Sequence, residues 1–175
     1  MTFDEAVKAE RISPEEAFAL FDSLPTVDLA FMRGTWKGSE LRTGHALDGL
    51  LGATGWYGKQ FLDGERVHPL LFFTTDRSAV FPVDPRKWPS PTLQGAVGQH
   101  RADVETDAFK ARLRLTEYRG KVSATMLYDD RPILDVFRKV DDGTVLGAMD
   151  ARGMPQPYFF VLRRDTDAAK LFPAH

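Results

Sequence analysis

Apolar side chains near the N-terminus recur at a helical spacing. In ISPEEAFALFDSL, residues 12–24, they follow a typical helix start: Ser13 can cap it, Pro14 suits its first turn, and two glutamates favour the positive end of the helix dipole. Residues 3–9 indicate a shorter helix before it. We therefore expect a helical extension over residues 1–26.

From residue 34 onward, short apolar runs alternate with turn sequences, which is typical of strands. We expect strands at 34–42, 55–62, 67–74, 78–83, 110–118, 121–128, 132–140, 144–150 and 157–164. A segment with three prolines, VDPRKWPSPTLQG, is expected to be a loop. The pattern predicts an all-β fold: one antiparallel β-barrel of about eight to ten strands over residues 27–164, followed by a tail over residues 165–175.

The hairpin around Asp142 and Gly143 allows its register to be predicted by counting. If these two residues form the turn, the residues on either side pair in sequence along both strands. That register sets Arg138 opposite Gly147, on a face that is otherwise apolar. A buried guanidinium is costly unless it is paired or functional. Arg138 is therefore expected either to point into the barrel and hold the anionic group of a ligand, or to pair with a buried carboxylate.

The same register sets Asp135 opposite Asp150. Two carboxylates at cross-strand distance repel each other unless one is protonated or a cation lies between them. This pair is a candidate acid/base site in which one carboxyl has a raised pKa. The alternative is a solvated outer face on which Arg152 bridges the two carboxylates.

A glycine-rich segment, GHALDGLLGATGWYG, carries a second candidate pair. If it forms a helical turn over the barrel mouth, His45 and Asp48 share one side, and Asp48 could orient the imidazole as a general base requires. The alternative is that His45 ends a strand and Asp48 caps a short helix.

The strands that follow contain further candidates for a ligand site. Strict alternation places Tyr57 and Lys59 on one face and Trp56 on the other. Trp56 suits either the core or the wall of a cavity, and Lys59 faces either a ligand or solvent. His68, which precedes Pro69, either points into a cavity or is a core histidine with its hydrogen bonds satisfied.

Several phrases resemble a known bacterial family. GTWKG, residues 34–38, followed by TGHALDGLLGATGWYGKQF and HPLLF, resembles GXWXG-domain proteins, and MLYDDRPILDVFRKVDDGTVLGAMDARG with YFFVLRR resembles the domain of unknown function that follows in them. The short motif is also similar to the first strand of lipocalins, fatty-acid-binding proteins and nitrobindins. This resemblance implies a lipocalin-like barrel in which Trp36 fills the closed end, while Gly34 and Gly38 let the strand coil.

Composition and charge narrow the possible functions. The chain of 175 residues has 23 basic and 25 acidic side chains without long blocks of like charge, so neither a nucleic-acid surface nor a membrane surface is indicated. It has no cysteine and no histidine spacing typical of zinc, and we expect neither a metal nor another cofactor. The N-terminus lacks the features of a signal peptide, and no apolar run would span a membrane, so we expect a cytoplasmic protein.

The function expected from these features is the binding of a small hydrophobic molecule with a polar or anionic head inside the barrel. Arg138 would meet the head. The candidates for the other contacts are Trp56, Tyr57, Lys59, His68, Phe137 and Phe160. The alternative is a cofactor-free, isomerase-like acid/base enzyme that uses the His45–Asp48 pair or the Asp135–Asp150 pair. Haem binding, by analogy with nitrobindins, is a third hypothesis. A homodimer is compatible with all three.

Overall fold

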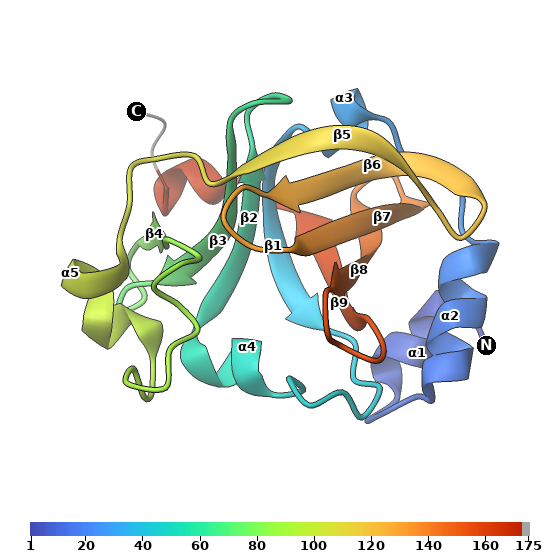
Figure 1. Cartoon of the computed structure of the whole chain (residues 1–175), viewed down its shortest axis with the longest axis horizontal. Helices are drawn as coiled ribbons and strands as arrows, with labels where there is room; N and C mark the ends of the chain where they lie inside the picture. Colours follow the sequence, from blue (N-terminus) through green and yellow to red (C-terminus); the bar gives the residue numbers. More distant parts are fainter. Residues whose placement is uncertain (173–175) are drawn as a thin grey trace.

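The computed structural model describes residues 1–172, and its centre is a closed ring of antiparallel strands (Figure 1). The strands are β1 (Gly34–Glu40), β2 (Trp56–Phe61), β3 (Val67–Phe73), β4 (Val80–Pro82), β5 (Ala111–Tyr118), β6 (Lys121–Tyr128), β7 (Ile133–Asp141), β8 (Thr144–Ala151) and β9 (Tyr158–Arg164). Their order is β2-β1-β9-β8-β7-β6-β5-β3, and pairing of β2 with β3 closes the ring; β4 pairs only with β3. The predicted all-β barrel is thus confirmed.

The ring is joined unevenly around its circumference. Strands β1 and β9 pair over residues 36–40 and 160–164, whereas β3 and β5 share a single pair, Val67 opposite Ala111. Two further backbone hydrogen bonds support this seam, from Lys110 to Val67 and from Leu113 to Gly64. Among the strands that form the ring, β3 and β5 are therefore joined by the fewest residue pairs.

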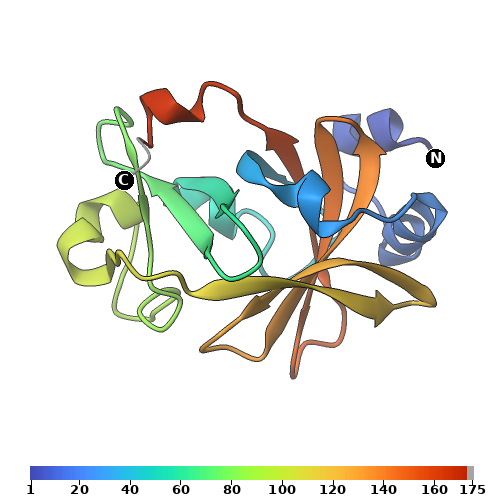
Figure 2. The ribbon, with the colours of Figure 1, turned by 90° about the horizontal axis from the view of Figure 1, so that it is seen from above.

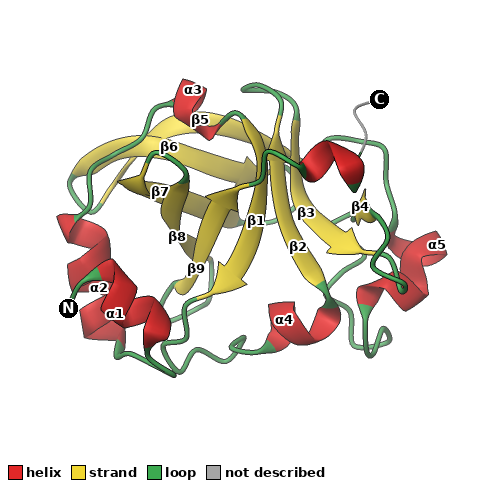
Figure 3. Cartoon of the chain, turned by 180° about the vertical axis from the view of Figure 1, so that it is seen from behind, coloured by secondary structure: helices red, strands yellow, loops and turns green. Residues whose placement is uncertain are grey.

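Short helices surround the barrel (Figure 3). They are α1 (Phe3–Lys8), α2 (Pro14–Ser23), α3 (Leu29–Met32), α4 (Leu50–Thr54) and α5 (Arg101–Val104), with 3-10 turns at Val97–His100 and Ala168–Lys170. Both α1 and α2 begin with a capping box, in which a Thr or Ser and a Glu three residues later bond each other's backbone N–H groups. None of the described helices is long and apolar enough to cross a membrane.

Helices α1 and α2 lie on the opposite side of the molecule from α5 (Figures 1 and 2). They cover the outer face of the sheet formed by β7, β8 and β9. Residues that form this outer core are Leu20, Phe21, Val136, Leu146, Ala148, Phe159 and Val161. The three strands are therefore buried on both faces, because their other face lines the barrel interior. Of the predicted tail, residues 173–175 lie outside the described residues.

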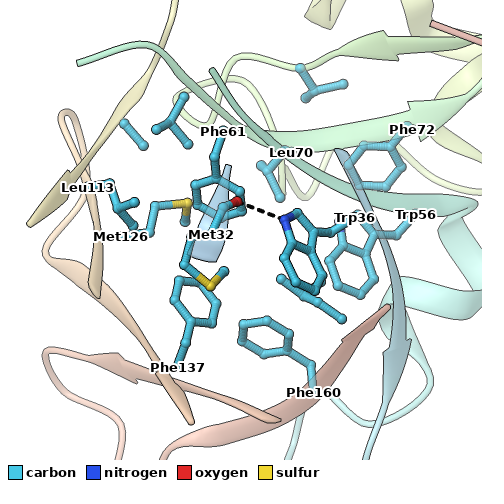
Figure 4. Packing of buried hydrophobic residues seen from close by; sticks show 14 of the residues in the cluster. Met32, Trp36, Trp56, Phe61, Leu70, Phe72, Leu113, Met126, Phe137 and Phe160 are labelled. Carbon is cyan, nitrogen blue, oxygen red and sulfur yellow. Dashed lines mark hydrogen bonds between the residues drawn. The ribbon is translucent and has the colours of Figure 1, made fainter. Parts of the chain in front are cut away.

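One end of the barrel interior is filled by Trp36, which is fully buried. Its indole Nε1 donates a hydrogen bond of 2.8 Å to the carbonyl of Met32 in α3 (Figure 4). The guanidinium of Arg164 lies 4.2 Å from the centre of the indole ring. Trp36 thus closes the end of the barrel that α3 covers, while α4 lies at the other end (Figure 1).

The predicted hairpin register is correct only next to its turn. Asp141 lies opposite Thr144 as expected, but Val140 is an extra residue in β7, and Lys139 then pairs with Val145. This β-bulge shifts all later pairs by one residue. The counting argument could not detect it, because nothing in the local sequence marks the bulge.

The shift overturns the two cross-strand pairs that the sequence predicted. Arg138 lies opposite Leu146, and Asp135 lies opposite Met149. Asp150 pairs with Leu134 instead, so the two aspartates are not neighbours across the strands. Asp135 lies on the face of β7 that points into the barrel, whereas Arg138 lies on the face that packs beneath α2.

Candidate functional site

A cavity of about 230 Å³ lies at the end of the barrel that α4 covers. Its walls are formed by strand residues Trp56, Lys59, Leu70, Tyr128, Ile133, Asp135, Met149, Tyr158 and Phe160. Its mouth is lined by loop and helix residues Leu47, Leu50, Leu51, Pro85, Trp88, Pro89, Arg131 and Met154. The cavity is thus mostly apolar and aromatic, which is typical of small-molecule sites.

A buried ion pair lies in the wall of this cavity. Nζ of Lys59 in β2 is 2.8 Å from Oδ2 of Asp135 in β7, and the two side chains are only 4% and 1% exposed. The ammonium group contacts Oδ2, whereas Oδ1 of Asp135 has no hydrogen-bond partner within residues 1–172. Burial raises the pKa of the Asp135 carboxyl, and the charge of Lys59 opposes that shift.

The ammonium group of Lys59 is surrounded by aromatic rings. It lies 5.7 Å from the ring centre of Trp56, 5.6 Å from that of Tyr128 and 5.2 Å from that of Phe160. It donates a hydrogen bond of 2.9 Å to the carbonyl of Pro69. Cation–π contacts and this hydrogen bond stabilise the charge in an otherwise apolar wall.

Two tyrosines add hydroxyl groups to the cavity wall. The hydroxyl of Tyr128 is 3.4 Å from Nζ of Lys59, and burial together with the charge of Asp135 raises its pKa. The hydroxyl of Tyr158 is buried beside the carboxylate of Glu40. Burial, followed by the carboxylate of Glu40, raises the pKa of Tyr158. Both hydroxyls are therefore neutral at ordinary pH.

A second bulge decides which residues of β2 face the cavity. Gly58 interrupts the pairing of β2 with β3, so Trp56 and Lys59 both point inward. The predicted alternation, with Tyr57 and Lys59 on one face, is wrong. Tyr57 packs outside the barrel against Phe73 and donates a hydrogen bond of 2.7 Å to Asp165. Gly58 is required here because its φ is 153° and a Cβ would come within 1.9 Å of the Trp36 carbonyl oxygen.

Two aromatic rings of the cavity lie flat against glycines of neighbouring strands. A Cβ on Gly38 would come within 2.2 Å of the Trp56 indole, and one on Gly147 within 2.4 Å of the Phe160 ring. Both glycines thus leave room for a ring. Figure 4 shows Trp56 and Phe160 pointing into the same interior as Phe137. Phe137 itself lies deeper, in contact with Phe61, and is not part of the cavity wall.

Arg138 lies outside the barrel, contrary to the prediction that it faces a ligand. It is fully buried beneath α2, 4.7 Å from the ring centre of Phe21. It donates a hydrogen bond of 2.9 Å to the carbonyl of Tyr118, and a longer one of 3.4 Å to that of Phe137. Burial lowers the pKa of this guanidinium, but the backbone carbonyls and the ring hold it in place. No buried carboxylate pairs with it within residues 1–172.

The predicted His45–Asp48 pair does not form. The carboxylate of Asp48 accepts backbone N–H bonds from residues 43, 44 and 45, at 2.7 to 3.1 Å, and so stabilises a turn. Nδ1 of His45 accepts a hydrogen bond from the N–H of Leu47, and its ring packs against Tyr158. Both residues line a surface pocket with Glu10, not the barrel cavity. The carboxylate therefore does not orient the imidazole.

His68 and Asp150 also lie outside the cavity. His68 is buried on the outer side of β3, with its ring 4.5 Å from that of Phe109, and burial lowers its pKa to about 4. Asp150 lies on the outer face of β8 beside Arg152. No cluster of three or more possible metal ligands occurs within residues 1–172. Neither His45 nor His68 thus lies in the barrel interior.

Tyr128 and Tyr158 were not predicted from the sequence. A signal was present for Tyr158, because it stands two residues before Phe160 in the run YFF, and alternate residues of a strand share a face. Tyr128 ends β6, one turn before β7, so its position over Lys59 depends on the closure of the ring. The structure therefore brings together Trp56, Lys59, Asp135 and Phe160 of the predicted set and adds these two tyrosines.

Two family models match the chain one after the other. The family described as GXWXG protein matches residues 19–76, and the one described as domain of unknown function (DUF4334) matches residues 109–164. No curated protein matches. A solved structure, the "crystal structure of protein from Thermomonospora curvata", is 35% identical, covers 93% of this chain and 95% of its own, and superposes with a TM-score of 0.70. The resemblance seen in GTWKG and the C-terminal phrases is thereby confirmed, and the chain belongs to the family of GXWXG proteins with this second domain of unknown function.

Proposed function

We propose that this protein binds a small, largely apolar molecule in its barrel cavity, with one polar group of that molecule beside Lys59 and Asp135. The observation that carries the proposal is the enclosure of a charged pair by an aromatic and aliphatic wall. Buried charges are costly, and a binding site is a common reason to retain them.

The size of the cavity limits the ligand. An apolar cavity of about 150 Å³ accommodates benzene, so 230 Å³ suits a molecule of about nine non-hydrogen atoms by the same ratio. Longer chains would have to extend through the mouth between α4 and Trp88. The proposed ligand is therefore a small ring compound or a short-chain compound, not a long-chain lipid.

A matched pair of variants tests the proposal. Ile133 and Leu134 are neighbours in β7, but Ile133 lines the cavity and Leu134 lies on the outer face. Tryptophan fluorescence is followed while monocyclic aromatic compounds of about nine non-hydrogen atoms are added. Native mass spectrometry checks for a co-purified ligand. Ile133→Phe should weaken binding at least tenfold, because it fills the cavity, and Leu134→Phe should leave it unchanged. Equal binding by both variants would contradict the proposal.

A second candidate function is a cofactor-free acid/base enzyme. One observation favours it: Asp135 lies in the cavity wall, has a raised pKa, and its Oδ1 has no hydrogen-bond partner within residues 1–172. Asp135 with Lys59 would then take the role that the sequence assigned to His45 with Asp48. Such an enzyme should exchange a C–H hydrogen of its bound substrate for deuterium in D₂O, as seen by mass spectrometry. Exchange that persists in Asp135→Asn would exclude Asp135 from this role.

A further inference from the structure

Lys59 has little hydrogen-bonding capacity left for a ligand. An ammonium group has three N–H donors. One points to the carbonyl of Pro69 at 2.9 Å, and Asp135 lies 2.8 Å away. The hydroxyl of Tyr128 is next, at 3.4 Å. The charge of Lys59 is thus already neutralised by its partner, and its protons face groups of the protein.

Asp135 is in the opposite situation. A carboxylate can accept about four hydrogen bonds, and even a protonated carboxyl keeps an oxygen free to accept. Asp135 is 1% exposed and lines the cavity; its Oδ2 contacts Lys59, but its Oδ1 has no hydrogen-bond partner among the described residues. An unsatisfied buried acceptor is unfavourable, and a ligand that brings a donor would remove this penalty.

The remaining charges do not favour an anion inside the cavity. The charged residues that line it, within residues 1–172, are Lys59, Asp135 and Arg131. Arg131 stands at the mouth, where it donates a hydrogen bond of 2.8 Å to the carbonyl of Pro85. A carboxylate placed beside Asp135 would meet a negative charge without a free positive one.

Resting on the proposed binding function, we propose that the cavity selects neutral molecules that carry a hydroxyl group, and that this hydroxyl donates its hydrogen bond to Asp135. Tyr158 adds a second buried hydroxyl to the same wall. An alcohol can donate a hydrogen bond to Asp135, whereas an ether cannot donate.

Compounds that share a skeleton and differ in one group test this proposal. We would titrate the protein with 2-phenylethanol, its methyl ether, ethylbenzene and phenylacetate, and repeat the series with 1-octanol, octyl methyl ether, octane and octanoate. Isothermal titration calorimetry measures each Kd. The alcohol is expected to bind about 10- to 100-fold more tightly than the ether or the hydrocarbon, as for a hydrogen bond to a charged group. The carboxylate is expected to bind most weakly.

Asp135→Asn tests the role of the carboxylate itself. It removes the charge that neutralises Lys59, so the preference for alcohol over carboxylate should fall at least tenfold. Asp150→Asn is the matched control, because Asp150 lies on the outer face of the next strand. If Asp135→Asn does not fold, the double variant Lys59→Met/Asp135→Leu replaces the pair with apolar groups, and ethylbenzene should then bind at least as tightly as 2-phenylethanol.

The possible outcomes separate the two proposals. Equal binding of alcohol, ether and hydrocarbon would overturn the selection by Asp135 while leaving the cavity as a binding site. Tightest binding of the carboxylates would overturn it too, since Lys59 would then be free to hold an anion. An absence of binding in both series would overturn the proposed function and this inference together.

Discussion

The indole of Trp56 lies against the backbone of Gly38, so close that a Cβ on Gly38 would come within 2.2 Å of its ring. This contact accounts for the last glycine of GTWKG. The sequence predicted that both glycines of the motif let the strand coil, but they differ in conformation. Gly34 has φ of 120°, which disfavours other residues, whereas Gly38 makes room for an aromatic ring of the neighbouring strand.

Gly38→Ala should therefore destabilise the protein by about 1–3 kcal/mol, the usual range for overpacking. Denaturant unfolding measures the change. Trp56→Phe, added to Gly38→Ala, should recover part of the loss because it removes the atoms that clash. Gly52→Ala is the control, since a Cβ there meets nothing within 4 Å. If both alanine variants unfold alike, the close contact of Gly38 with Trp56 has no effect on stability.

Arg138→Met should reduce stability without changing ligand binding. The guanidinium donates to the carbonyl of Tyr118 and packs on Phe21, outside the cavity. Loss of a charged hydrogen bond costs about 1.5–3 kcal/mol. On this variant, thermal melts measure stability, and titration with 2-phenylethanol measures ligand affinity. Weaker binding at unchanged stability would mean that Arg138 acts in the cavity after all.

The stability of the protein should depend on His68 between pH 6.5 and pH 4. Burial lowers the pKa of His68 to about 4 in the folded state, while the unfolded chain binds a proton near pH 6.5. As the pH falls through this window only the unfolded state gains the proton, so the free energy of unfolding decreases by about 3 kcal/mol.

His68→Leu should remove this part of the pH dependence, because leucine has a similar volume and no charge. Urea unfolding of the wild type and of His68→Leu between pH 4 and pH 6.5 gives the free energy of unfolding of each protein as a function of pH. Parallel curves for the two proteins would show that His68 is protonated as readily in the folded state as in the unfolded one.

Trp36→Ala should destabilise the barrel by about 3–5 kcal/mol, as for other buried aromatic residues. The indole is fully buried and does not line the cavity, so the fraction that stays folded should bind 2-phenylethanol with unchanged affinity. Calorimetric melting and titration at low temperature measure both effects. A variant that melts like the wild type but has lost binding would instead place Trp36 in the ligand site.

Much of the architecture was predictable because it depends on local signals. The caps at Ser13 and Thr2, the turn at Asp142 and Gly143, and the short apolar runs all act within a few residues of the chain. The inward side of β7 was not predictable. Helices α1 and α2 bury its outer face, so Arg138 and Asp135 both stand among apolar neighbours, and the pattern does not separate inside from outside.

The candidate site was harder to predict because it depends on two bulges. Val140 moves Asp135 away from Asp150, and Gly58 brings Lys59 to the same side as Trp56. The Lys59–Asp135 pair then joins β2 and β7, which lie on opposite sides of the ring with three strands between them in either direction. Only Gly58 left a trace in the sequence, since an isolated glycine in a strand often marks a bulge.

The sparse pairing of β3 with β5 bears on how the segments that match the two families depend on each other. The part that matches GXWXG contains β1 to β3, and the part that matches the domain of unknown function contains β5 to β9. Either part alone would be an open sheet with two unpaired edges and an uncovered apolar face. The two are therefore complementary fragments of one folding unit. A gene that encoded only one of them would yield a product that must assemble with the missing fragment in trans.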